Sequence, residues 1–92
     1  MHEDKTKQLT SELNQATDII LRAIEERLAP VNIKIDQNMA LRYAVCARHN
    51  TERELLRDPE YVSLCEAFKE LYNTRTDLRG LREGLENFRK TF

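Results

Sequence analysis

The sequence is poor in the residues that form turns. Trp is absent, and Gly and Pro contribute only two residues each to a chain of 92. A sheet of many short strands needs frequent turns, which draw on Gly and Pro. The composition therefore favours a few long helices over a sheet. A chain of this length forms one small domain, so we expect a single helical domain over residues 1–92 in which residues 1–5 are frayed.

Long apolar runs are absent as well. No window approaches the roughly 20 apolar residues that a transmembrane helix needs, and the N-terminus lacks the apolar region of a signal peptide. We therefore expect a cytoplasmic protein that does not act at a membrane. In that reducing compartment the two thiols of the chain, Cys46 and Cys65, should stay reduced.

Neither sign of charge is in excess. The chain carries 15 basic and 16 acidic residues, which leaves a net charge of −1. No strong field therefore draws the protein onto nucleic acid or an anionic membrane. The charged and hydrophobic fractions, 34% and 40%, are typical of a globular or coiled-coil protein.

Residues 6–29 are predicted to form the first helix. Their apolar side chains recur at helical spacing and therefore share one stripe. The stripe consists of Leu9, Leu13, Ala16, Ile20, Ile24 and Leu28. Ile19 lies off this stripe and Leu21 lies at its margin, which hints at a second contact surface. Pro30 should end the helix, because the residue before a proline is pushed out of the helical backbone conformation.

The segment 31–35 alternates apolar and polar residues, which is the periodicity of a strand. Five residues without a partner strand cannot form a sheet, so we expect an extended connector that lies on the helices. The alternative is a short ladder between this segment and its copy in a dimer. Asp36 should then cap a second helix over residues 37–57, in which a capping box that begins at Thr51 marks a kink or restart.

The third predicted helix covers residues 59–91. Asp58 can cap it, Pro59 suits its first turn, and Glu60 opposes the positive end of its dipole. An apolar residue recurs at every seventh position of this helix. These residues are Leu64, Leu71, Leu78, Leu85 and Phe92.

Further apolar residues flank that line of heptad positions. Tyr61 and Phe68 flank it in the first half of the helix, and Leu81 and Phe88 flank it in the second half. The predicted apolar seam therefore drifts around the helix along its length.

The length of the third helix allows two arrangements. An unbroken helix would be roughly 50 Å long, whereas a compact chain of this size has a radius of gyration of about 12 Å. The helix should therefore break near Asn73 or Gly80, or find a partner surface. We expect an all-α fold of three main helices, the third long and straight or bent, assembled as a helical bundle or as a dimer of coiled-coil hairpins.

Residues that could carry chemistry are few. Cys46 and His49 lie one helical turn apart, and Cys65 or His2 would have to complete a zinc site with them. Strong zinc signatures contain two closely spaced pairs, and this chain has one mixed pair. The sequence also contains no glycine loop that could bind phosphate. We therefore expect no catalytic residues, no cofactor and no metal, and a protein that is not an enzyme.

Arginines form the only basic clusters. Arg75, Arg79 and Arg82 follow helical spacing and should form a stripe along one face of the third helix. Such a stripe can form ordinary salt bridges, bind an acidic protein or follow phosphates. The acidic residues interleaved with it argue against phosphates.

The sequence therefore indicates a non-enzymatic protein–protein interaction module: a small adaptor, regulator, chaperone or inhibitor that forms a homodimer. Its predicted binding surface is apolar and lined by arginines. The residues of that surface are Arg75, Arg79, Arg82, Leu78, Leu81, Leu85, Phe88 and Phe92. The alternative is a dimeric helical regulator that binds nucleic acid through the arginines.

Overall fold

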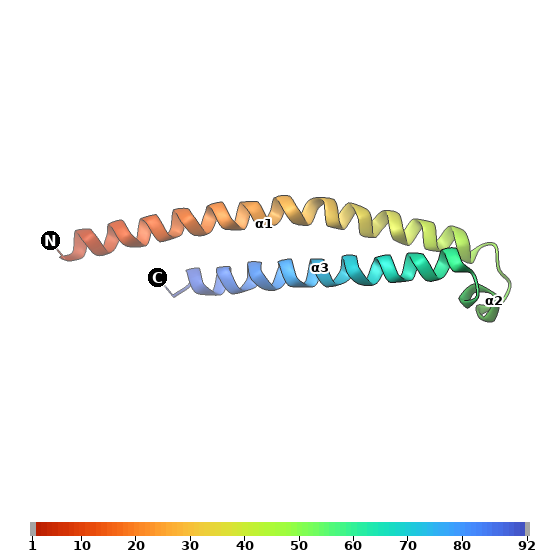
Figure 1. The fold of residues 1–92 in the computed structure, drawn as a ribbon. Coiled ribbons are helices and arrows are strands. Elements are labelled where there is room, and N and C mark those ends of the chain that lie inside the picture. Colours follow the sequence, from red (N-terminus) through yellow and green to blue (C-terminus); the bar gives the residue numbers. More distant parts are fainter. Residues whose placement is uncertain (1, 92) are drawn as a thin grey trace.

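The chain folds into a long helical hairpin (Figure 1). The computed structural model describes residues 2–91, with side chains from residue 4 onward. Helix α1 covers His2–Cys46, the short α2 covers Glu52–Leu56, and α3 covers Pro59–Arg89 and returns antiparallel along α1. The predicted all-α fold of three helices is confirmed, and the part of the chain that the structure describes contains no strand.

The hairpin is strongly elongated. It measures 74 × 17 × 14 Å and has a radius of gyration of 21.0 Å, against about 12 Å for a compact chain of this length. The turn and α2 close one end of the hairpin (Figure 1). Both termini lie toward the other end, where α1 extends beyond the end of α3. We call these the closed end and the open end.

The face of α1 that packs on α3 follows a strict heptad pattern. Buried and half-buried side chains recur at alternating steps of four and three residues. They are Asn14, Thr17, Leu21, Ile24, Leu28, Val31, Ile35, Asn38, Arg42 and Val45. Half-buried Thr10 continues this spacing on the part of α1 that extends past the end of α3, and Asn32 and Cys46 are half-buried beside the row. A repeat of 3.5 residues keeps one face of a long helix turned toward its neighbour when the two helices wrap around each other.

The face of α3 that packs on α1 follows the same heptad pattern. Its half-buried and buried positions recur at steps of three and four residues. They are Tyr61, Leu64, Phe68, Leu71, Arg75, Leu78, Arg82, Leu85 and Arg89. We call these two rows together the seam.

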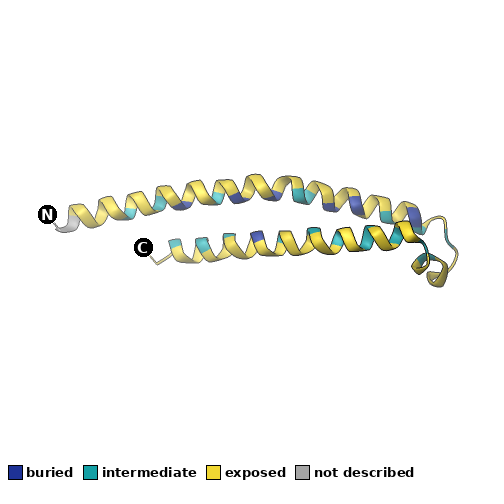
Figure 2. Ribbon diagram, in the orientation of Figure 1, coloured by how far each residue is buried: buried dark blue, intermediate teal, exposed yellow. Residues whose placement is uncertain are grey.

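The best-packed part of the seam lies in its apolar middle. Ile24, Leu28 and Leu78 form a buried cluster, against which Val31 and Leu85 pack. Figure 2 shows the buried residues of α1 along the side that faces α3. The core is therefore a single line of side chains between two helices.

Pro30 does not end the first helix, contrary to the prediction. It lies inside α1, on an exposed position. A proline inside a helix costs about 3 kcal/mol relative to Ala because it removes one backbone hydrogen bond and crowds the preceding turn. Burial of Leu28 and Val31 on either side of it against α3 offsets that cost, since each buried apolar side chain contributes roughly 1.5–3 kcal/mol. The helix bows away from α3 along its length (Figure 1).

The predicted connector at 31–35 and the separate helix at 37–57 are therefore wrong in their boundaries. Both the connector and the first part of that helix belong to α1. The alternation of apolar residues misled the prediction, because Val31 and Ile35 lie on the seam at a helical step of four whereas Ile33 is exposed. Asp36 caps nothing, since it lies in mid-helix.

The predicted helix starts at the closed end are confirmed. Thr51 caps α2 by accepting a hydrogen bond from the backbone N–H of Glu54, and the Glu54 side chain accepts from the N–H of Asn50. Asp58 caps α3 by accepting from the N–H of Glu60, and Pro59 occupies the first turn. These starts depend on side chains within a few residues of one another, so they are visible in the sequence.

Helix α3 is continuous through both sites at which a break was considered, Asn73 and Gly80. A first helix of residues 6–29 alone, about 36 Å long, would be too short to cover it. Because α1 contains 45 residues, it is roughly 67 Å long. It covers the whole seam face of α3, so no break is needed.

Candidate interaction surface

The fold divides the three arginines that were predicted to form one stripe. Arg75 and Arg82 are half-buried seam positions, whereas Arg79 is exposed. The reason is the heptad spacing, since Arg82 follows Arg75 by seven residues and occupies the same face. The Arg75 Cζ atom lies 5.3 Å from the centre of the Tyr72 ring, which is a cation–π distance.

Ion pairs connect the arginines of the seam to α1. Arg82 Nη1 donates a hydrogen bond to Glu25 Oε1 at 2.9 Å, and Arg89 forms an ion pair with Asp18. The hydrogen bond to Glu25 raises the pKa of Arg82 above its usual value. The two pairs lie on the same side of the hairpin, which we call the ionic flank.

Two of the apolar residues predicted to bind a partner instead hold the hairpin together. Leu78 is only 6% exposed, and Leu85 packs against the buried cluster. Leu81 and Phe88 are 60% and 49% exposed. The predicted drift of the seam toward these two residues is wrong, because the seam continues straight through the arginines. Phe92, the remaining apolar residue of the prediction, lies outside the described residues.

Helix α1 contributes exposed apolar residues that the sequence places in the core. Leu9, Leu13 and Ile20 are all exposed. Steps of seven residues back from Ile24 and Leu28 lead to positions directly next to the residues of the predicted apolar stripe, and not to those residues themselves. They reach Leu21, Thr17, Asn14 and Thr10. An exact 3.5-residue repeat was the signal that could have separated the buried row from the exposed one.

Toward the end of α3, the exposed residues Leu81 and Phe88 lie on the side opposite the ionic flank. At 100° per residue, Leu81 and Phe88 lie to one side of the seam residue Leu85. Arg82 and Arg89 lie to the other side, where they reach α1. Leu81 and Phe88 therefore face away from the ion pairs.

The same division holds around α1. Asp18 and Glu25 lie to one side of the seam residue Ile24, toward the arginines. Ile20 lies to the other side of Ile24. Leu9, Leu13, Ile20, Leu81 and Phe88 thus share one flank, toward the open end, whereas other exposed apolar residues such as Ile33 and Tyr72 lie elsewhere on the hairpin. We call this area the open-end surface; it consists of Leu9, Leu13, Ala16, Ile20, Leu81 and Phe88.

Part of the open-end surface lies on a stretch of α1 that α3 does not reach. Arg89, the last residue of α3, pairs with Asp18. Because the helices are antiparallel, residues well before Asp18 extend past the end of α3 (Figure 1). We call residues 4–13 the overhang.

A shallow groove runs along α3 beside the open-end surface. It has a volume of about 660 Å³ and is lined by Thr76, Asp77, Gly80, Leu81, Gly84 and Leu85. A Cβ atom added at Gly80 or Gly84 would meet no other atom within 4 Å. The two glycines therefore do not serve packing inside the hairpin, and they leave room for an approaching helix.

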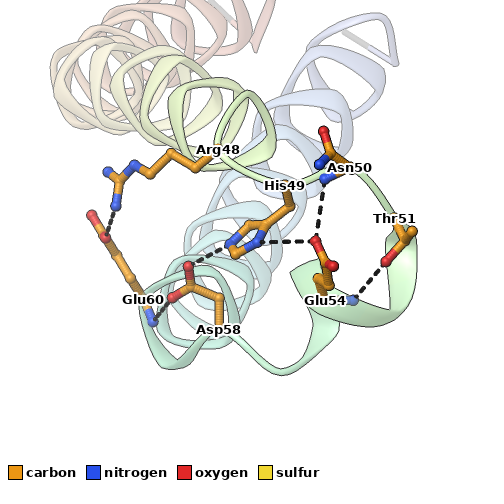
Figure 3. Close-up of polar contacts among 7 residues, drawn as sticks. All are labelled: Arg48, His49, Asn50, Thr51, Glu54, Asp58 and Glu60. Carbon is orange, nitrogen blue, oxygen red and sulfur yellow. Dashed lines mark hydrogen bonds and ion pairs between the residues drawn. The ribbon is translucent and has the colours of Figure 1, made fainter.

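A polar cluster at the closed end joins α1 to α3 (Figure 3). His49 Nε2 lies 2.8 Å from Asp58 Oδ2, and His49 Nδ1 lies 4.0 Å from Glu54 Oε2. Arg48 Nη1 donates to Glu60 Oε2 at 2.9 Å. The hydrogen bonds that Asp58 accepts from His49 and from the backbone N–H of Glu60 lower its pKa. The contacts tie the end of one long helix to the start of the other.

The contacts of the His49 imidazole are with carboxylates. Cys46 and Cys65 are half-buried free thiols. Both ring nitrogens of His49 face carboxylates, those of Asp58 and Glu54. Within the described part of the chain, no three His, Cys, Asp or Glu side chains are placed to bind a metal ion.

Comparison with known proteins adds no relative. No protein family, curated protein or solved structure matches the chain. None of the helices over residues 2–91 contains an apolar stretch that could cross a membrane. The function is therefore argued from the surface of the hairpin.

Proposed function

We propose that the protein is a non-enzymatic protein–protein interaction module of the cytoplasm, a coiled-coil hairpin that presents its open-end surface to another protein. The observation that supports this most is the gathering of Leu9, Leu13, Ile20, Leu81 and Phe88 on one flank of one end. Large apolar residues that are contiguous on a surface mark interaction sites, whereas scattered ones do not.

The energetics favour a bound state. Burial of an apolar side chain contributes roughly 1.5–3 kcal/mol, and the open-end surface carries five large ones. These five residues keep between 41% and 60% of their surface exposed in the hairpin. A protein that covers the open-end surface therefore gains free energy without disturbing the fold. A second copy of the chain is one such protein.

The placement of the arginines favours a protein partner over nucleic acid. Arg75, Arg82 and Arg89 are held in the seam, and two of them pair with carboxylates of α1. Binding to phosphates needs several cations that can leave their own partners. The role of these arginines in the proposal is to hold α3 in register beside α1.

Site-specific photo-crosslinking tests this proposal. A photoreactive amino acid replaces Leu81, and the protein is irradiated in the cells that make it. Ile33 is the matched control, because it is 57% exposed but lies elsewhere on α1. We expect protein adducts from position 81 and none from position 33. Equal yields at the two positions, no adduct at either, or adducts with nucleic acid would contradict the proposal.

A further inference from the structure

We infer that the open-end surface binds a second copy of the chain, in a two-fold dimer in which the overhang of each copy lies along the α3 groove of the other. The inference rests on the proposed function and names the partner of that surface. In a two-fold dimer, every copy must carry both of the surfaces that meet in the contact, which we call its two halves. Each hairpin has both, an overhang with exposed Leu9 and Leu13 and a groove bordered by exposed Leu81.

The two halves lie on the same flank, the overhang at the open end and the groove nearer the middle of the hairpin. Leu13 and Ile20 occur seven residues apart on α1, as do Leu81 and Phe88 on α3. Further along this flank of α1, the next heptad positions are Arg27 and Lys34. On α3 they are Thr74, Ala67 and Glu60. By the register of Glu25 with Arg82, Leu81 lies at the level of Glu26, so the apolar area ends about halfway along the hairpin and the contact is confined to the half that contains the open end.

An antiparallel contact between the two α1 helices, centred on Ala16, brings these parts together. Leu9 of one copy then lies at the level of Ala23 of the other, since both are seven residues from the centre. The pair Glu25–Arg82 sets the register within each hairpin, so Ala23 lies at the level of Gly84. By the same count, Leu13 of one copy lies at the level of Ile19, and therefore of Phe88, in the other copy.

The groove has room for an approaching helix, and one lysine of the overhang arrives near its aspartate. Leu9 of the overhang meets Gly84, where a Cβ atom would have no neighbour within 4 Å. Small residues at such a crossing allow two helix backbones to approach closely. Lys5 lies one turn before Leu9 on the overhang, and the groove is lined by Asp77. The overhang as a whole carries no net charge, because Asp4 and Glu12 balance Lys5 and Lys7. Lys5 arrives at the level of Gly80, about one helical turn from Asp77.

The exposed area is sufficient for such a dimer. The hairpin exposes 7346 Å², whereas a compact monomer of this mass exposes about 5,600 Å². The excess is about twice the roughly 800 Å² that each partner contributes to a standard interface. A net charge of −1 places no strong repulsion between two copies.

Mass and shape together test the dimer. At micromolar concentration, light scattering should give twice the chain mass of 10.9 kDa. Two hairpins of 74 Å that overlap only over their open ends, by about 42 Å, should give a maximum dimension of roughly 105 Å in X-ray scattering. A dimer whose maximum dimension stays near that of one hairpin would overturn the inference, because the copies would then lie side by side along their whole length.

Substitution of a glycine in the groove tests whether the dimer can be weakened while the hairpin stays folded. Gly84→Gln adds a side chain into space that is empty in the hairpin, so the circular dichroism of the helices should be kept while the dimer weakens at least tenfold. Leu81→Glu should have the same effect, and Ile33→Glu should leave the dimer intact. A dimer that survives both Gly84→Gln and Leu81→Glu would overturn the inference. If the wild-type chain is monomeric and yet crosslinks to another protein through position 81, the inference fails and the proposed function stands.

Discussion

Arg82 of α3 donates a hydrogen bond of 2.9 Å to Glu25 of α1, a residue that precedes it by 57 positions. The contact places a charged side chain in the row of α3 that packs on α1. Leu81, its neighbour in sequence, is turned outward and is 60% exposed. The surface available to a partner thus follows from the register in which the two long helices pack.

The apolar middle of the seam should carry most of the stability of the hairpin. Leu78→Ala removes the one residue of α3 that is buried, and we expect it to cost about 2–5 kcal/mol of unfolding free energy. Urea unfolding followed by circular dichroism measures this change. Ile33→Ala is the control and should cost less than about 0.5 kcal/mol, because Ile33 is exposed. Similar losses for both variants would mean that α3 does not pack on α1 through Leu78.

Pro30 should weaken the helix in which it lies. Pro30→Ala restores a backbone N–H that can donate to the carbonyl of Glu26, and it should raise the unfolding free energy by up to about 3 kcal/mol. Thermal unfolding measures the gain. If Pro30 instead ended a helix, the substitution would be neutral or destabilising, which distinguishes the two arrangements.

Asn38 is a polar residue buried in the seam. Its Nδ2 donates to the backbone carbonyl of Leu64 at 2.8 Å, and its Oδ1 has no hydrogen-bond partner among the described residues. Asn38→Leu should therefore keep or raise stability, whereas Asn38→Asp should cost about 1–3 kcal/mol because it buries a charge. Chemical denaturation of both variants gives the values.

The gain from Asn38→Leu should come with a loss of specificity, because a single buried Asn fixes the register of paired helices. Spin labels on α1 and α3 would then report a broader distance distribution than in the wild type. The exposed neighbour Gln37 provides the control, and Gln37→Leu should leave the distribution unchanged. A narrow distribution for Asn38→Leu would show that the apolar seam alone sets the register.

The closed end should lose stability in acid. Hydrogen bonds from His49 and from the backbone N–H of Glu60 hold the pKa of Asp58 below its ordinary value, which is about 3.9. A lowered folded-state pKa contributes stability above the unfolded value, and this contribution is lost as the pH falls through the folded value. Asp58→Asn removes the charge, and Asn still caps a helix.

The difference in unfolding free energy between wild type and Asp58→Asn should accordingly shrink as the pH falls below the unfolded pKa of about 3.9. Urea unfolding at a series of pH values measures it. Asp36→Asn, at an exposed position of α1, should have little effect. A difference that grows in acid would contradict the prediction that the ionised Asp58 side chain stabilises the fold.

The sequence by itself determined the elements whose causes are local. The scarcity of Gly and Pro indicated long helices, and Asp58, Pro59 and Thr51 marked two helix starts that the structure confirms. Each of these signals acts within about four residues through a side chain, a fixed φ angle or the end of a helix dipole. Such signals do not depend on what lies across the hairpin.

Only the tertiary structure decided where α1 continues and which of its faces is buried. The cost of Pro30 is local, but the burial of Leu28 and Val31 that offsets it depends on α3. Leu13 and Asn14 are one residue apart, and local sequence favours burial of the leucine. Two helices in contact over a long distance must keep a repeat of 3.5 residues. That repeat, set by the packing of Ile24 and Leu28 on Leu78, places Asn14 in the seam and leaves Leu13 exposed on the open-end surface.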